Sequence, residues 1–202
     1  DLVPGQSLLD VPAVRAIYRY RRSEFWMRVF TALAVLSIGM LAGIIIAVAL
    51  SLALVLKRAA VPSTATLGRV PGTDTYRDVI DHPDAELTPG LFVYRFDAAI
   101  FFANASRFRD EIQAAIDEAD PPVRCVVIDA ESVYDIDSTG AQVLLELLDT
   151  LDEHEIRLVL ARVRTELRDE LRNSGIEDRI GVEHIYLEVD DAVTAFVEHK
   201  VD

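Results

Sequence analysis

The feature that most constrains this chain is an uncharged run from Val29 to Leu56, which is 28 residues long. The hydrocarbon core of a bilayer is about 30 Å thick and an α-helix rises about 1.5 Å per residue, so roughly twenty apolar residues are enough to cross it. The run therefore predicts that the chain enters a membrane.

The run is longer than one upright span requires. A single helix of this length would extend about 42 Å and would need a strong tilt or a protruding end. Gly39 and Gly43 lie near the middle of the run, and two glycines four residues apart weaken a helix and permit a tight turn. The sequence is thus compatible with one tilted helix or with a hairpin whose two arms have about 14 residues each.

Basic residues flank the run on both sides and favour the hairpin. They are Arg15, Arg19, Arg21, Arg22 and Arg28 before the run, and Lys57 and Arg58 after it. Basic residues prefer the cytoplasmic side of a membrane, and a transmembrane hairpin over residues 25–58 places both clusters there, whereas a single crossing separates them. Arms this short leave polar backbone groups in the hydrocarbon unless other protein covers them, which indicates a larger membrane bundle.

The segment before the run, residues 1–24, combines apolar and arginine side chains. This pattern is typical of an amphipathic segment that lies in the membrane interface, and it lacks the charged-then-apolar order of a signal peptide. The sequence also begins with Asp1 rather than Met. We therefore expect it to be the carboxy-terminal part of a longer protein.

Charge divides the chain into two parts. Residues 1–60 contain seven Lys or Arg and three Asp or Glu, whereas residues 61–202 contain thirteen and thirty-one. The net charges are therefore +4 and −18, which sum to the −14 of the whole chain. Nucleic acids and anionic lipid surfaces bind basic patches, so the acidic second part argues against nucleic acid as a partner and against a flat attachment to lipid.

The acidic part shows alternating strand and helix patterns, which predict an α/β domain with a mostly parallel sheet and helices packed on it. We expect a linker at residues 59–90 that can hold a short strand at 65–70, and a domain at 91–202. The strand patterns cover 91–96, 98–102, 123–128, 156–161 and 182–187, and the helical patterns begin at Asn104 or Ser106, span 143–151 and 165–174, and begin again at Asp190 or Asp191.

Cysteine and histidine indicate little chemistry. Cys125 is the only cysteine and lies in the apolar run 123–128, so we expect a buried structural thiol. The four histidines include no pair at metal-ligand spacing. We assign neither a metal nor a cofactor.

One turn carries the candidate site, because Asp137, Ser138, Thr139 and Gly140 follow a strand pattern and open a helix. The N-terminus of a helix presents backbone N–H groups and a dipole that favour an anion, so hydroxyl groups here are placed to carry a phosphoryl group or to contact an anion. The alternative is structural, with Asp137 or Ser138 acting only as an N-cap worth about 1 kcal/mol.

Nearby carboxylates do not predict an enzyme. Asp129 and Asp135 are conceivable metal ligands, but carboxylates at strand ends are more often solvated or act as caps. With Asp137 they lack the paired base, the nucleophile or the metal set that an enzyme site needs.

The Asp137–Gly140 turn between a buried strand and an amphipathic helix resembles the signature of STAS domains, which occur in anti-sigma-factor antagonists and in sulfate permeases of the SulP family. Further segments resemble the SulP version, namely Leu67–Thr73 with Tyr76–Asp78, Phe101–Ala105, and Glu24 and Phe25 ahead of Thr31 and the Gly39/Gly43 pair. The resemblance covers residues 8–200.

This resemblance implies the last membrane segments and the STAS domain of a secondary-active transporter for sulfate or a similar oxyanion. It implies a multi-pass protein of the cell's inner membrane, with the STAS domain in the cytoplasm as a regulatory and assembly tail. The implied partners are the rest of the permease membrane domain, the lipid bilayer, a second copy in a homodimer, and a regulatory protein or a nucleotide at the STAS domain. No transport residue carries over, because the family's substrate site lies between earlier membrane helices.

The resemblance also gives Ser138 a role. Ser138 matches the serine that a kinase-type anti-sigma factor phosphorylates in bacterial antagonists, and Thr139 is the second candidate. A freestanding, phospho-regulated antagonist is therefore the alternative to a transporter's tail. The uncharged run from Val29 to Leu56 has no place in such a protein.

Overall fold

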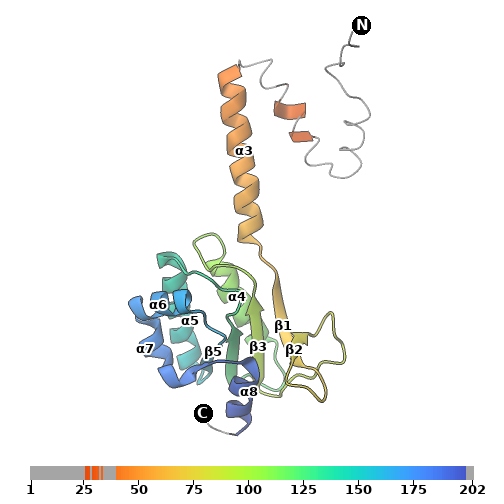
Figure 1. The fold of residues 1–202 in the computed structure, drawn as a ribbon, viewed down its shortest axis with the longest axis vertical. Helices are drawn as coiled ribbons and strands as arrows, with labels where there is room; N and C mark the ends of the chain where they lie inside the picture. Colours follow the sequence, from red (N-terminus) through yellow and green to blue (C-terminus); the bar gives the residue numbers. More distant parts are fainter. Residues whose placement is uncertain (1–25, 28, 32, 34–39, 199–202) are drawn as a thin grey trace, which may run out of the picture. The chain divides into compact units, whose positions relative to one another are not determined.

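The computed structural model describes residues 26–27, 29–31, 33 and 40–198. The chain divides into two compact units, residues 1–57 and 58–202. The first contains most of helix α3 (Met40–Ala60), and the second contains the last three residues of this helix and every strand of the described chain (Figure 1).

Helix α3 is one uninterrupted helix of 21 residues. At 1.5 Å per residue it is about 31 Å long, and it is long and apolar enough to cross a membrane. Its apolar side chains are largely exposed, with Leu41, Val48 and Leu52 at 74%, 62% and 67%. Exposed apolar surface of this extent indicates contact with lipid or with other protein.

The structure differs from two details of the expected hairpin. Gly43 lies in the first turn of α3 and is therefore helical, so it is not the turn residue that the sequence suggested, and this arm has 21 residues rather than about 14. One glycine four residues into an apolar helix is tolerated at about 1 kcal/mol. Gly39 lies outside the described residues, and the hairpin stays a prediction.

The second unit is built on a six-stranded sheet with the order β2-β1-β3-β4-β5-β6. The strands are β1 (Thr64–Arg69), β2 (Tyr76–Asp78), β3 (Leu91–Phe96), β4 (Cys125–Asp129), β5 (Arg157–Ala161) and β6 (Ile185–Tyr186). β3, β4, β5 and β6 run parallel, whereas β1 pairs antiparallel with both β2 and β3. The α/β fold with a mostly parallel sheet is confirmed.

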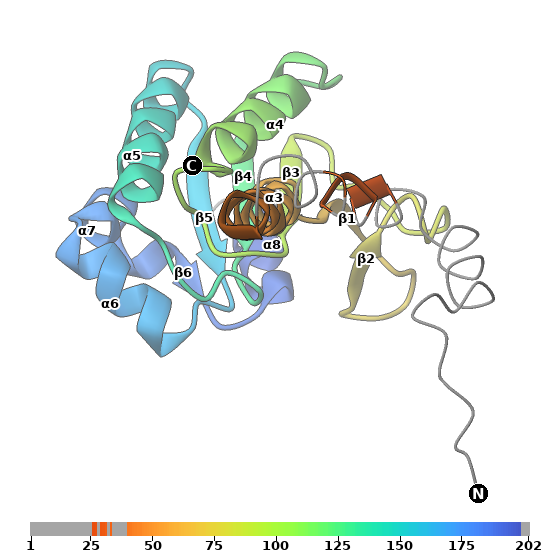
Figure 2. The ribbon, with the colours of Figure 1, turned by 90° about the horizontal axis from the view of Figure 1, so that it is seen from above.

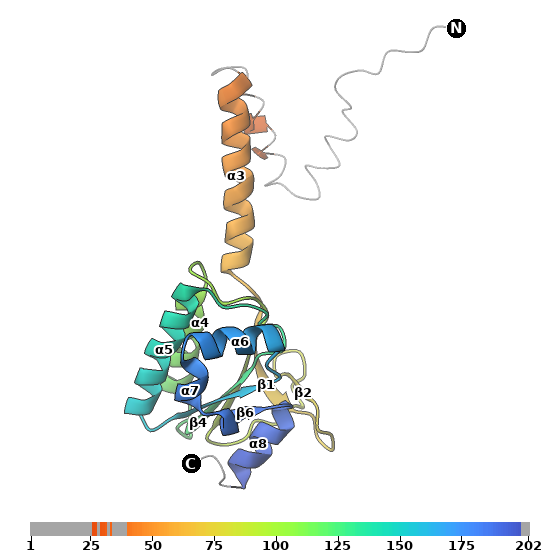
Figure 3. The ribbon, with the colours of Figure 1, turned by 60° about the vertical axis from the view of Figure 1, so that its left-hand side comes forward.

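Helices cover both faces of the sheet. They are α4 (Ala105–Asp117), α5 (Ser138–Glu153), α6 (Thr165–Asn173), α7 (Ile176–Ile180) and α8 (Val189–Val197), and a 3-10 turn, η1 (Val182–His184), precedes β6. α4, α5, α6 and α7 share one apolar core with the sheet, and α8 shares a second core with the opposite face. α4 and α5 lie side by side (Figure 2 and Figure 3).

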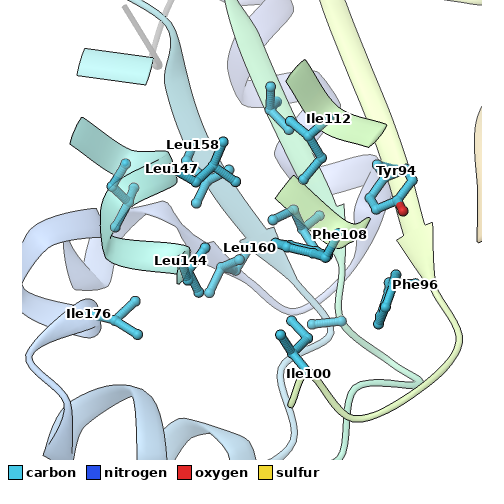
Figure 4. Packing of buried hydrophobic residues seen from close by; sticks show 14 of the residues in the cluster. Tyr94, Phe96, Ile100, Phe108, Ile112, Leu144, Leu147, Leu158, Leu160 and Ile176 are labelled. Carbon is cyan, nitrogen blue, oxygen red and sulfur yellow. The ribbon is translucent and has the colours of Figure 1, made fainter. Parts of the chain in front are cut away.

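The larger core has aromatic rings at its centre. The rings of Phe96 on β3 and Phe108 on α4 meet edge to face with their centroids 5.3 Å apart, a favoured geometry for aromatic pairs. Leu144 and Leu147 of α5 and Leu158 and Leu160 of β5 lie in the same cluster (Figure 4). The apolar stripe that the sequence predicted for α5 is entirely buried and comprises Val143, Leu144, Leu147, Leu148 and Leu151.

Three elements differ from the sequence expectation. Residues 98–102 form a loop with one isolated bridge between Ile100 and Ile136, and the expected strand at 182–187 is reduced to β6 because η1 occupies its first half. β1 pairs with β3, so the sheet starts well before residue 91, where we placed the domain boundary. The first and third differences depend on partners distant in the sequence, which local patterns do not reveal.

Cys125 is fully buried in β4 beside α8, in the smaller core. Burial raises the pKa of its thiol to about 12, because the thiolate is poorly solvated there. The expected buried structural thiol is confirmed.

We predict that N-ethylmaleimide does not label Cys125 in the folded chain at mildly alkaline pH, because reaction requires an accessible thiolate. The same chain unfolded in urea should be labelled completely, and mass spectrometry measures both. Rapid stoichiometric labelling of the folded chain would contradict this assignment.

Candidate functional site

The candidate site lies where two loops meet at the carboxyl ends of neighbouring parallel strands. One loop follows β3 and the other follows β4 and leads into α5. Asp137 is the N-cap of α5, with an extended backbone. Its Oδ1 accepts a hydrogen bond from the Gly140 amide at 2.7 Å, and its Oδ2 accepts one from the Phe102 amide at 3.0 Å. The Asp137 carboxylate therefore joins the start of α5 to a loop 35 residues earlier.

Backbone hydrogen bonds hold the same two loops together. The Ile100 amide donates to the Asp135 carbonyl at 3.0 Å, and the Asp137 amide donates to the Ile100 carbonyl at 3.1 Å. This short parallel bridge positions the Asp137 backbone independently of its side chain.

Gly140 is required by the close approach of the two loops. A Cβ atom built on Gly140 would lie 2.5 Å from the Ile100 carbonyl oxygen, closer than non-bonded atoms approach. Only glycine leaves room for the backbone of residue 100 at this point. The glycine of the turn thus has a packing role.

Ser138 and Thr139 are the first two residues of α5, and both are exposed. The first amides of a helix have no acceptor within the helix, and the helix dipole favours negative charge at this end. The two hydroxyl groups are therefore accessible from solvent at a position that tolerates a phosphoryl group. Of the two N-cap candidates from the sequence, Asp137 rather than Ser138 caps α5.

Two exposed aromatic side chains belong to the same pair of loops, and the sequence analysis did not assign them to the site. Phe102 is 62% exposed and Tyr134 is 60% exposed. The Phe102 ring meets the Phe101 ring edge to face, with centroids 5.3 Å apart. Phe102 is thus an exposed side chain whose own amide is held by Asp137.

Asn104 makes side-chain bonds that the sequence did not predict. It occupies the N-cap position of α4, as expected, but its side chain makes no bond to that helix. It is 1% exposed; its Oδ1 accepts from the Phe101 amide at 2.9 Å, and its Nδ2 donates to the carbonyls of Ala99 at 2.9 Å and Ala59 at 3.3 Å. A buried amide with three backbone partners organises a loop, which local spacing alone does not indicate.

Asp129 is not the solvated or capping carboxylate that we expected. It is fully buried at the end of β4, and both of its oxygens accept from the guanidinium of Arg162, with Nε at 2.9 Å from Oδ1. A buried carboxylate needs such a partner because desolvation of an unpaired charge is costly. Asp135 is exposed and contributes only its carbonyl to the site. In the described part of the chain, no group of three or more side chains is arranged to hold a metal ion.

A polar cleft beside Arg162 is lined by arginine and carboxylate side chains from β2, β3 and the start of α8. Most of these charges already pair within the protein. Arg162 binds Glu131 at 2.6 Å, Arg95 lies 3.2 Å from Asp97, and Asp190 lies 3.3 Å from Arg69. This cleft therefore presents little unbalanced charge to a ligand.

The family model described as "STAS domain" matches residues 82–192, which is more than half of the chain. The chain belongs to the STAS-domain family. The STAS domain of this chain extends beyond the matched residues, because β1 and β2 precede residue 82 and are strands of the same sheet. The family predicted from the Asp137–Gly140 turn is confirmed.

Relatives of this STAS protein include named transporters. A probable sulfate transporter of Mycobacterium tuberculosis is 39% identical over 189 residues, which cover 94% of this chain and 34% of that protein. Sulfate transporter 1.1 of Arabidopsis thaliana is 35% identical over 194 residues, which cover 92% of this chain and 30% of that protein. The chain thus spans about a third of the length of these relatives.

Among solved structures, the murine Slc26a9 anion transporter in the inward-facing state is similar with a TM-score of 0.80. The similarity covers 95% of this chain and 31% of that one at 21% sequence identity. At this identity the likeness establishes the fold.

We predict that Gly140→Ala destabilises the STAS domain by about 1–3 kcal/mol, the usual effect of forcing an extra methyl group into a packed site. The matched control is Thr139→Ala, one residue earlier and exposed, which should change stability by less than about 0.5 kcal/mol. Urea unfolding followed by circular dichroism measures both. A Gly140→Ala chain as stable as the parent would show that the loops do not pack as described.

Proposed function

We propose that this chain is the carboxy-terminal part of a SulP-type secondary-active anion transporter, and that its STAS domain regulates and assembles the transporter. The observation that carries this proposal is the direct connection between α3, an apolar helix of membrane-spanning length, and β1 of the STAS domain through residues 61–63 alone. Relatives that are named sulfate transporters align with over 90% of the chain, and so include both parts.

The proposed substrate is sulfate or a similar oxyanion. The chain corresponds to about a third of its relatives, and we assign the substrate site to the membrane domain that makes up the remainder. The proposed arrangement is a homodimer in the cell membrane, with the acidic STAS domain in the cytoplasm. The exposed apolar surface of α3 disfavours the alternative, a freestanding anti-sigma-factor antagonist.

We further propose that Ser138 is a phosphoacceptor. Its hydroxyl is exposed at the first position of α5, and its neighbour Asp137 links this helix to the loop after β3. A phosphoryl group adds a charge of about −1.5 to −2 at neutral pH. This charge therefore arises beside the carboxylate that holds the two loops together.

We expect Ser138→Asp to lower the rate of sulfate uptake by the intact transporter at unchanged abundance in the membrane, because the new carboxylate competes with Asp137 for the amides at the start of α5. Uptake of labelled sulfate and quantitative blotting measure the two quantities. Ser138→Ala is the matched control and should retain uptake. Equal uptake by Ser138→Asp and the parent would refute the switch.

The hairpin is tested by cysteines at Arg22 and Ala60 of the intact transporter. Both should react with a membrane-impermeant maleimide from the same side of sealed vesicles, because the basic residues near both positions favour the cytoplasm. The transporter without these two cysteines is the control for background labelling, and Cys125 is buried. Labelling from opposite sides would establish a single crossing.

A further inference from the structure

The loop from Ile100 to Asn104, here called the 100–104 loop, is anchored at its middle residue and at its last residue. Its Phe102 amide donates to Asp137 at the start of α5, and the Asn104 side chain donates to Ala59. Ala59 belongs to the last residues of α3, which lie in the same compact unit as the STAS domain. One five-residue segment therefore connects the candidate site to the end of the apolar helix.

The anchor at Ala59 has a clear physical basis. The last four carbonyl groups of a helix receive no hydrogen bond from an N–H group of that helix. Ala59 is the second-last residue of α3 and so has one of these carbonyls. Asn104 Nδ2 donates to this free carbonyl from a position 45 residues away in the sequence. Asn104 thus caps the C-terminal end of α3.

The remaining bonds of Asn104 make this anchor depend on the shape of the loop. Its Oδ1 holds the Phe101 amide and its Nδ2 also holds the Ala99 carbonyl. An unpaired polar group is costly in a buried site, and all three bonds depend on the position of one side chain. A shift of the loop that displaces the Phe101 amide therefore disturbs the bond to Ala59.

We propose that Asn104 is a positioning residue that couples the Ser138 turn to the end of α3 through the 100–104 loop. This inference rests on the proposed role of Ser138 as a phosphoacceptor. A phosphoryl group on Ser138 repels the Asp137 carboxylate and competes with it for the amides at the start of α5. Asp137 then releases the Phe102 amide, the 100–104 loop shifts, and Asn104 loses its bond to Ala59.

The coupling is tested on the 202-residue chain in lipid nanodiscs, with spin labels on cysteines at Lys57 and Glu153. Both side chains are exposed, and Cys125 is too buried to be labelled. Double electron–electron resonance gives the distribution of distances between the labels. Its width reports how firmly the end of α3 is held.

We expect Ser138→Asp to broaden the distribution. Asn104→Asp should broaden it to a similar extent, because Asp keeps the acceptor for the Phe101 amide and lacks the donors for Ala59 and Ala99. Adding Ser138→Asp to Asn104→Asp should broaden it no further, since the connection is already broken. Ser106→Ala, an exposed change two residues after Asn104 in α4, is the matched control and should have no effect.

An unchanged distribution in Asn104→Asp, or an additive effect of the two substitutions, would overturn the coupling. Circular dichroism that matches the parent would show that Asn104→Asp leaves the domain folded. Asn104→Gln is a second variant, which retains the donor at a longer reach and should give a narrower distribution than Asn104→Asp. If Ser138→Asp alters sulfate uptake without broadening the distance distribution, the role of Ser138 is supported and its coupling to α3 is refuted. If it broadens the distribution without altering uptake, the coupling stands and the switch falls.

Discussion

The Asp137 carboxylate is the interaction on which the candidate site depends. One oxygen caps α5 through Gly140 and the other holds Phe102, so the two loops at the carboxyl ends of β3 and β4 become one structure. Gly140 permits this arrangement because a larger residue would collide with the Ile100 carbonyl. The turn therefore connects the two loops at the carboxyl ends of β3 and β4, and Ser138 and Thr139 are exposed beside this connection.

The loop after β3 also contacts the last residues of α3. Asn104 binds Ala59 from within the loop that Asp137 holds, and residues 61–63 alone separate α3 from β1. A short connection with a buried, fully bonded amide restricts the backbone more than a flexible linker does.

Local patterns predicted the parts of the fold that depend on periodicity. The buried stripe of α5 followed from the spacing of residues such as Leu144 and Leu147. The strands β4 and β5 followed from their continuous apolar runs. The turn at Asp137 and Ser138 followed from its composition. The pairing of Asp129 with Arg162, the place of β1 in the sheet and the bond from Asn104 to Ala59 did not, because each depends on a partner more than 25 residues away. Gly43 was assigned to a turn because glycine weakens helices, yet the surrounding apolar residues keep it helical.

Amide hydrogen exchange at Phe102 tests the central role of Asp137 most directly. Phe102 is exposed, so its bond to Asp137 is the main source of protection for its amide. In Asp137→Asn one side-chain oxygen remains to cap α5, and the other is replaced by a donor that cannot accept from Phe102. The account predicts exchange at Phe102 at least roughly tenfold faster in this variant, since a hydrogen bond to a charged group contributes about 1.5–3 kcal/mol. Equal exchange rates in the parent and the variant would contradict it.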